Sequence, residues 1–130
     1  MDEIAKYYEN FEPNAKEICA VLAVRISEAL EESEAKIWHG SPAWFIDGNP
    51  IVGFSPTKDR GVRLMFWSGQ DFDEPKLTER GEKFKDASIF YTDPSQIDLP
   101  ELYRWLMKSR DIQWDYKNIV KRKGKLVRLR

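Results

Sequence analysis

The chain has 130 residues, the usual size of one domain, and 42% of them are apolar and 13% aromatic. A disordered chain would lack this aromatic content, and the single cysteine excludes an intramolecular disulfide. The net charge is −1, but residues 117–130 hold seven Lys and Arg and no acid, so the rest of the chain is acidic. We expect one folded domain over residues 1–130 that ends in a basic C-terminal tail, residues 117–130.

The N-terminus lacks the basic start and the apolar run of a secretory signal, and no apolar run approaches the length of a membrane span. We therefore expect a cytoplasmic protein without a membrane partner. Cys19 lies among apolar residues of a predicted helix, so we expect a buried thiol rather than a catalytic one. With one Cys and one His, the sequence has no Cys/His zinc-binding spacing.

Apolar residues spaced three and four apart predict helices in three places. A short helix is expected over residues 2–11, and a long one runs from residue 15 to about residue 32, with Asn14 as its candidate N-cap. The third helix begins after Asp98, its predicted N-cap. The pattern allows this helix to continue or restart through residues 114–120, with Gly124 as the stop.

Short extended runs between these helices predict strands at residues 36–39, 43–46, 51–55, 62–67 and 87–91. Asp47-Gly48 is a strong hairpin signal, whereas residues 68–86 have the composition of a long polar loop. Because short turns join the strands, we predict an α+β fold. It has an antiparallel sheet of about five strands, with the N-terminal and C-terminal helices packed on one face.

A run of aromatic, glycine and proline residues opens the strand region. It reads Trp38-His39-Gly40-Ser41-Pro42-Ala43-Trp44. A strand at residues 51–54, Lys58, a strand at residues 62–66 and Gly69 follow it, and the helix after Asp98 completes the order. This order, over roughly residues 15–110, resembles the YdhG-like family of uncharacterised domains. The basic tail lies outside the family pattern.

The resemblance implies little about activity. Most members of the family have no assigned activity, and one branch is described as frataxin-like, an iron chaperone that delivers iron for haem and iron–sulfur assembly. The resemblance therefore implies a binding module with iron or another small ligand as its cargo. Its oligomeric state stays open, and the sequence carries no catalytic signature.

Acidic residues provide one candidate for the iron cargo. Glu28, Glu31 and Glu32 follow an i, i+3, i+4 spacing at the end of the predicted long helix. Carboxylates on adjacent turns can share a hard cation, although a solvated acidic face explains the same spacing. A second acidic group lies in the long loop and consists of Asp71, Asp73 and Glu74.

Aromatic side chains provide the other candidate site, because alternate positions on neighbouring strands bring rings together on one sheet face. The ligand-binding candidates are Trp38, His39, Trp44, Lys58 and Trp67. Core packing is the alternative explanation for the rings, and turn positions are the alternative for His39 and Lys58. A second hypothesis is an enzyme with a small pocket around Trp38, His39, Trp44 and Lys58, although His39 has no evident catalytic partner.

The basic tail supports a third hypothesis, an interaction protein. The tail interleaves Leu126, Val127 and Leu129 with its cations but contains no aromatic residue. Proteins that bind single-stranded nucleic acid normally supply stacking rings, so we do not expect nucleic acid as a partner. The tail either holds an acidic partner or docks on the acidic body of the chain itself.

Overall fold

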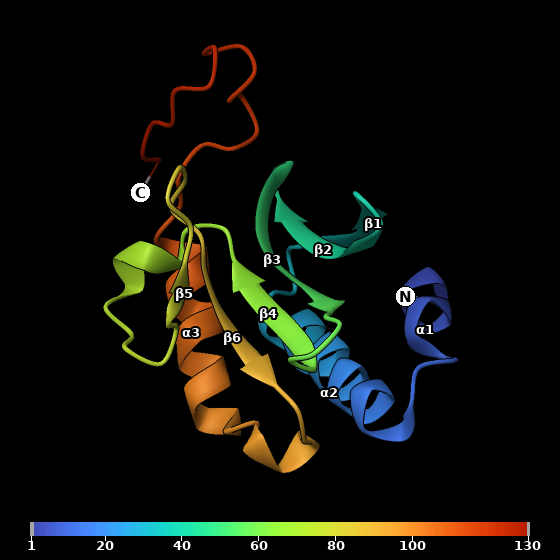
Figure 1. The fold of residues 1–130 in the computed structure, drawn as a ribbon. Coiled ribbons are helices and arrows are strands. Elements are labelled where there is room, and N and C mark those ends of the chain that lie inside the picture. Colours follow the sequence, from blue (N-terminus) through green and yellow to red (C-terminus); the bar gives the residue numbers. More distant parts are fainter. Residues whose placement is uncertain (1, 130) are drawn as a thin grey trace.

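An antiparallel sheet forms the centre of the structure, a computed structural model that describes residues 2–129 (Figure 1). Its strands are β1 (Glu34–Trp38), β2 (Ser41–Ile46), β3 (Asn49–Pro56), β4 (Val62–Phe66), β5 (Glu79–Arg80) and β6 (Ala87–Tyr91). They follow the order β1-β2-β3-β4-β6-β5 across the sheet. The predicted α+β fold with an antiparallel sheet is confirmed, and the two-residue strand β5 brings the number of strands to six.

The helices are α1 (Asp2–Tyr8), α2 (Pro13–Ala29) and α3 (Leu99–Asp111), with 3-10 turns η1 (Gly69–Phe72) and η2 (Pro94–Gln96). α2 and α3 lie side by side behind the sheet in Figure 1, whereas α1 packs beside β1 and β2. We call the opposite face of the sheet, which α2 and α3 leave uncovered, the open face. No helix within residues 2–129 combines the length and the apolar character needed to cross a lipid bilayer.

The alternation along β4 separates the two faces of the sheet. Leu64 and Phe66 are completely buried, and the Phe66 ring meets the Trp105 ring of α3 edge-on, with the centroids 6.1 Å apart. Arg63 and Met65, at the intervening positions, are partly exposed. The side-chain period of two therefore places one set of residues in the core under the helices and the other set on the open face.

Helix α2 differs from its prediction at both ends. Its N-cap is Glu12 rather than Asn14, because the Glu12 carboxylate accepts hydrogen bonds from the backbone N–H groups of Ala15 (2.7 Å) and Asn14 (3.3 Å). The helix ends at Ala29, three residues earlier than expected, and the N–H of Leu30 closes its last turn on Ile26. The residues after it turn toward β1.

Helix α3 begins as predicted. The carboxylate of Asp98 caps it by accepting a hydrogen bond from the N–H of Glu101 at 3.0 Å. The helix ends at Asp111 and does not continue through residues 114–120. Residues 112–129 instead form an irregular segment beyond one end of the sheet, which we call the C-terminal lobe (Figure 1).

The two ends of the C-terminal lobe pair with each other. Trp114 and Arg128 form an antiparallel bridge, and the N–H of Asp115 donates to the carbonyl of Val127 at 2.7 Å. The loop between them carries Lys121, Arg122, Lys123 and Lys125 and is exposed. The basic segment is therefore folded back on itself and attached to the body of the protein at its base.

Candidate functional site

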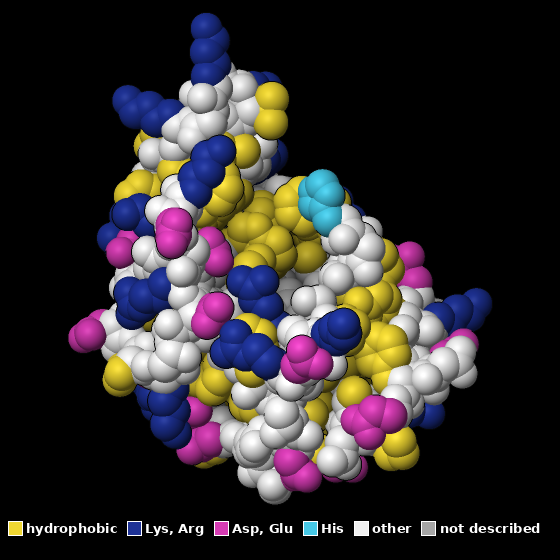
Figure 2. Space-filling model, in the orientation of Figure 1, with side chains coloured by type: hydrophobic (Ala, Val, Ile, Leu, Met, Phe, Trp, Pro, Cys, Tyr) yellow, Lys and Arg dark blue, Asp and Glu magenta, His cyan; other side chains and the backbone are white. Residues whose placement is uncertain are grey.

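A hollow of about 170 Å³ lies on the open face. Figure 2 shows it as an apolar depression, with the histidine drawn in cyan at its edge. The residues that shape it come from β1 to β4 and the turns beside them, and include Trp38, His39, Gly53, Arg63, Met65 and Trp67. Three of the five predicted ligand-binding residues, Trp38, His39 and Trp67, are thus brought together.

The floor of the hollow is the backbone of the sheet itself. Gly53 of β3 is paired with Ala43 of β2. A Cβ atom at Gly53 would lie 2.6 Å from the carbonyl oxygen of Pro42 and 3.2 Å from the Trp67 ring. The missing side chain therefore lets the Trp67 indole lie close against the sheet.

Two indole rings form the walls. The rings of Trp38, at the end of β1, and Trp67, directly after β4, have centroids 6.0 Å apart and planes inclined by 41°. β1 and β4 are not neighbours in the sheet, but a β-bulge between Trp44 and Phe45 shifts the register of β2. Such a bulge bends the strand, which brings β1 toward β4. The Trp38 ring also rests edge-on against Phe45, with the centroids 5.3 Å apart.

Arg63 supplies the cationic group of the hollow. Its Nε donates to the hydroxyl of Ser88 at 2.9 Å, and its Nη2 lies 3.6 Å from the Asp86 carboxylate. The side chain remains 34% exposed, and within residues 2–129 its Nη1 has no hydrogen-bond partner. Ser88 and Asp86 therefore fix the guanidinium in place, while one of its edges stays available as a donor.

His39 lies at the edge of the hollow for a backbone reason. His39 and Gly40 form the turn between β1 and β2, with φ values of 51° and 82°. Two consecutive positive φ angles are typical of a two-residue hairpin turn. The imidazole ring packs against the Trp38 ring, with the centroids 4.3 Å apart and the planes inclined by 55°. Neither a carboxylate nor a second titratable side chain among the described residues contacts it, so no catalytic pair is assembled there.

Trp44 and Lys58 do not line the hollow. Trp44 is adjacent to Ala43 and therefore points to the opposite face, where it is 1% exposed and its Nε1 donates to the Ser27 hydroxyl of α2 at 3.0 Å. Lys58 is exposed in the turn between β3 and β4. The pocket predicted around Trp38, His39, Trp44 and Lys58 does not form with those four residues.

The three glutamates predicted to hold a metal do not converge, because α2 ends before Glu31 and Glu32. Glu28 lies 4.0 Å from Arg25 and Glu32 lies 2.8 Å from Arg110, while Glu31 is exposed. Within residues 2–129 no group of three or more His, Cys, Asp or Glu side chains is placed to hold a metal ion. The iron site proposed from the helical spacing is therefore not assembled by these residues.

Two of the three residues of the second acidic group make internal contacts, and the third, Asp73, is exposed. Asp71 accepts a hydrogen bond from the Trp114 indole at 2.6 Å. Glu74 is almost completely buried and accepts hydrogen bonds from Arg104 (2.7 and 2.9 Å) and Lys108 (2.6 Å). Both residues therefore fasten the segment after β4 to the C-terminal part of the chain.

Cys19 is buried in α2, as predicted. Burial raises the pKa of its thiol to about 12, so the thiolate is not formed at neutral pH. The cysteine is a core residue and takes no part in a site.

The C-terminal lobe is attached directly beside the hollow. The side chain of Asn49 accepts hydrogen bonds from the N–H groups of Tyr116 and Lys117, both at 2.9 Å, and donates to the carbonyl of Trp114 at 2.9 Å. Such side-chain bonds compete with helical pairing, which explains why α3 does not restart here. The hydroxyl of Tyr116 in turn donates to the carbonyl of Trp67.

Sequence reasoning missed the roles of Arg63, Gly53 and Tyr116. For Arg63 the signal was present, because the alternation of β4 places Arg63, Met65 and Trp67 on one face. For Gly53 and Tyr116 it was absent, because their roles depend on contacts with residues distant in the sequence. Only the fold brings Tyr116 to Trp67.

Comparisons with known proteins agree with this fold. No protein-family profile and no curated protein sequence match the chain. A solved structure of a Bacillus subtilis protein, described as YdhG of the DUF1801 family, matches with a TM-score of 0.62. The match has 16% sequence identity and covers 95% of this chain and 93% of that one. The YdhG-like resemblance predicted from the sequence is confirmed at the level of the fold.

Proposed function

We propose that this chain, which shares the fold of a YdhG-like DUF1801 protein, is a small-ligand-binding module. Its ligand is a single planar ring that carries oxygen acceptors, such as an aromatic carboxylate or a cyclic imide. The ring enters the hollow and contacts both Trp38 and Trp67. The observation that carries the proposal is the pair of inclined indole rings over a glycine floor, with one edge of Arg63 available beside them.

The walls suit a flat apolar body. Aromatic pairs stack or meet edge to face with centroids about 4.5–7 Å apart. The indole planes are inclined by 41° with centroids 6.0 Å apart, so a third ring in the hollow meets both indoles at exposed faces or edges and is not sandwiched between them. The Met65 thioether adds an adaptable, polarisable contact at the same place.

The volume limits the ligand to one ring. A closed apolar cavity of about 150 Å³ accepts benzene. The hollow has about 170 Å³, which leaves room for one ring and a small substituent. A fused two-ring system would extend out of it into solvent.

The polar groups set the orientation of the ligand. Pockets of this kind are largely apolar, with a few fixed polar groups that give specificity. Arg63 is such a group, because Ser88 and Asp86 hold its guanidinium before any ligand arrives. A guanidinium can only donate hydrogen bonds, so the ligand presents a carboxylate or carbonyl oxygen to it.

Titration calorimetry with benzoate, uracil and benzylamine tests the proposal. We expect benzoate and uracil to bind with dissociation constants of about 1 mM or tighter. Each ligand has about nine non-hydrogen atoms, and each atom contributes roughly 0.5 kcal/mol of binding free energy. Benzylamine has the ring but presents a cation to Arg63, so it should bind more weakly. Absence of saturable binding by all three compounds contradicts the proposal.

Two variants locate the binding. Trp67→Leu keeps apolar bulk but removes a wall, and we expect about fivefold weaker binding from the loss of about 1 kcal/mol of ring contact. Arg63→Lys keeps the charge but loses the fixed planar fork, and should reduce the preference for benzoate over benzylamine. Tyr103→Leu on α3 removes an exposed ring on the helix-covered side and serves as the matched control. Equal losses in Trp67→Leu and Tyr103→Leu would place the binding elsewhere.

A further inference from the structure

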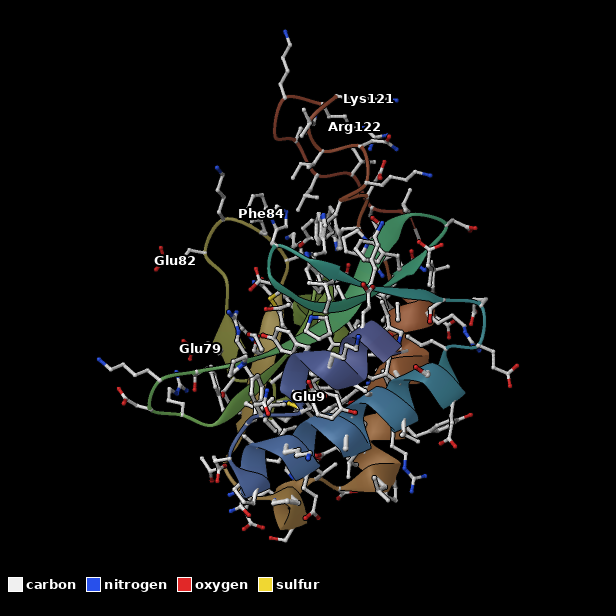
Figure 3. The ribbon with its side chains drawn as sticks, turned by 90° about the vertical axis from the view of Figure 1, so that its right-hand side faces the viewer. Glu9, Glu79, Glu82, Phe84, Lys121 and Arg122 are labelled. Atoms are coloured by element: carbon white, nitrogen blue, oxygen red, sulfur yellow. The ribbon has the colours of Figure 1, made fainter. Side chains whose placement is uncertain are left out.

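The C-terminal lobe and the hollow form one continuous surface. Tyr116 at the base of the lobe is bonded to Trp67 of the hollow, and its ring also meets the ring of Phe84, with the centroids 6.1 Å apart. Phe84 belongs to the loop between β5 and β6, which rises toward the lobe that carries Lys121 and Arg122 (Figure 3). Aromatic rings therefore run from the hollow to the foot of the basic lobe.

Three carboxylates on or beside this surface are each paired with an arginine. A fourth, Glu82 in the loop that carries Phe84, is exposed and makes no ion pair within residues 2–129. The three pairs are Asp86 with Arg63, Asp71 with Arg128, and Asp115 with Arg122. Burial would raise the pKa of Asp115, but hydrogen bonds from Asn118 and Arg122 outweigh it and lower that pKa, so the carboxylate remains charged and paired.

Three lysines of the lobe have no such role. Within residues 2–129 the side chains of Lys121, Lys123 and Lys125 make no hydrogen bond or ion pair, and all three residues are exposed. Figure 2 shows Lys and Arg side chains gathered on the lobe above the apolar hollow. This surface combines aromatic rings, which stack on planar groups, with unpaired cations, which attract negative charges. It is therefore complementary to an extended polyanion that carries planar groups.

We propose that this surface binds single-stranded nucleic acid, with one pyrimidine base in the hollow and backbone phosphates along the lobe. The inference rests on the proposed function, because the base is the single planar ring that the hollow accepts. Proteins that bind single strands combine a positively charged path with aromatic rings on which bases stack. The tail alone lacks rings, but the fold supplies them from Trp38, Trp67 and Tyr116.

The size and chemistry of the hollow favour a pyrimidine over a purine. A hollow of about 170 Å³ holds one ring, and a purine has two. Uracil and thymine present carbonyl oxygens on both sides of the ring, and these accept hydrogen bonds from Arg63. Every base has a face that stacks, so the preference is a matter of degree rather than of exclusion.

Fluorescence anisotropy with labelled single strands of about twelve nucleotides tests the inference on the full chain. We expect oligo(U) or oligo(dT) to bind more tightly than oligo(A), and more tightly than free uracil. The affinity should fall as salt rises, since neutralised phosphates release counterions. A difference between oligo(U) and oligo(dT) distinguishes RNA from DNA as the preferred strand.

Two matched triple variants separate the lobe from general charge effects. The first triple variant is Lys121→Gln, Lys123→Gln and Lys125→Gln, which removes three phosphate contacts. The slope of the logarithm of the binding constant against the logarithm of the salt concentration should become shallower by about two units, at about 0.7 for each contact. The control replaces three exposed lysines on other elements with the same change in net charge. These substitutions are Lys6→Gln, Lys16→Gln and Lys58→Gln.

The outcomes distinguish this inference from the proposed function. If uracil binds but oligonucleotides bind no more tightly, or if both triple variants lose affinity equally, the nucleic-acid inference is overturned and the ligand-binding module stands. If a polyglutamate peptide displaces oligo(U) at equal charge concentration, an acidic peptide is the better partner and the inference is also overturned. If neither uracil nor any strand binds, both proposals fail.

Discussion

The hydroxyl of Tyr116 donates a hydrogen bond of 2.5 Å to the backbone carbonyl of Trp67. The same oxygen accepts the N–H of Lys85 at 3.0 Å. Burial raises the pKa of Tyr116 to about 12, so the hydroxyl stays protonated and keeps donating at neutral pH. One side chain therefore ties together the C-terminal lobe, the wall of the hollow and the loop before β6.

Replacing this tyrosine by phenylalanine should loosen the lobe without removing its ring. We expect Tyr116→Phe to lower the free energy of unfolding by about 1–2 kcal/mol, because two backbone groups lose a partner in a partly buried place. Urea denaturation measures the loss. Tyr103→Phe, at a 58% exposed position on α3, should change stability by much less. Equal stabilities of the two variants would contradict the role given to Tyr116.

Asn49 should control the order of the lobe more directly. Its 3% exposed side chain joins the Asp47-Gly48 hairpin region to four groups of the lobe. In Asn49→Ala the N–H groups of Tyr116 and Lys117 lose their acceptor. We therefore expect the hydrogen-exchange rates of these two amides to rise tenfold or more, which corresponds to a loss of about 1.4 kcal/mol in the free energy of local opening. Asn49→Asp keeps the acceptor and should protect these two amides better than Asn49→Ala. Unchanged exchange in Asn49→Ala would show that the lobe is held by other contacts.

Stability should depend on pH through Glu74. Hydrogen bonds from Arg104 lower the pKa of this carboxyl against the opposing effect of burial, and Lys108 lowers it further. A carboxyl with a lowered pKa in the folded state stabilises the fold above its unfolded pKa of about 4.3, and this stabilisation is lost as the pH falls below that value. The free energy of unfolding should therefore drop as the pH is lowered from about 5 to about 2.

Glu74→Gln isolates this contribution. We expect a loss of about 2–3 kcal/mol at neutral pH, because two cations lose their partner, and a flatter dependence on pH in the acid range. Glu31→Gln is the control, because that side chain is exposed. If the acid slope of Glu74→Gln equals that of the unaltered protein, the stabilising carboxylate lies elsewhere.

Gly53 should be required for the shape of the hollow. In Gly53→Ala the new methyl group meets the Pro42 carbonyl oxygen at 2.6 Å, a backbone atom that cannot move aside cheaply. We expect a loss of about 1–3 kcal/mol in stability, together with weaker ring binding because the Trp67 indole is displaced. Thermal unfolding and benzoate titration measure the two effects. A variant as stable as the original, with unchanged ligand affinity, would mean that β2 and β3 adjust and that the close contact is not needed.

Local patterns in the sequence predicted the elements of the fold well. The Asp98 cap, the alternation of β4 and the Asp47-Gly48 hairpin each depend on residues close together in the chain, and all are present. Local patterns left the structure open where distant contacts decide it. α3 does not restart after residue 111, because Asn49 takes the amides of Tyr116 and Lys117.

The candidate site shows the same division. Trp38 and Trp67 were identifiable from their strands. Trp44 instead points to the opposite face of the sheet from Ala43, its neighbour in β2, and belongs to the core beneath α2. The glutamates of the expected metal site separated because the helix ended before Glu31. The apolar periodicity alone predicted a helix that is too long, because periodicity carries no information about where the chain must leave α2 to begin β1.

The central claim is that one planar ring binds in the hollow in contact with both Trp38 and Trp67. A two-dimensional ¹H–¹⁵N NMR titration with uracil tests it, because each of the five tryptophans gives one indole cross-peak. Single Trp→Phe variants assign these peaks. We predict large shifts for Trp38 and Trp67 and little change for Trp44 and Trp105, which are buried on the other face of the sheet. Shifts confined to other tryptophans, or no shift of Trp38 and Trp67 at saturating uracil, would contradict the claim.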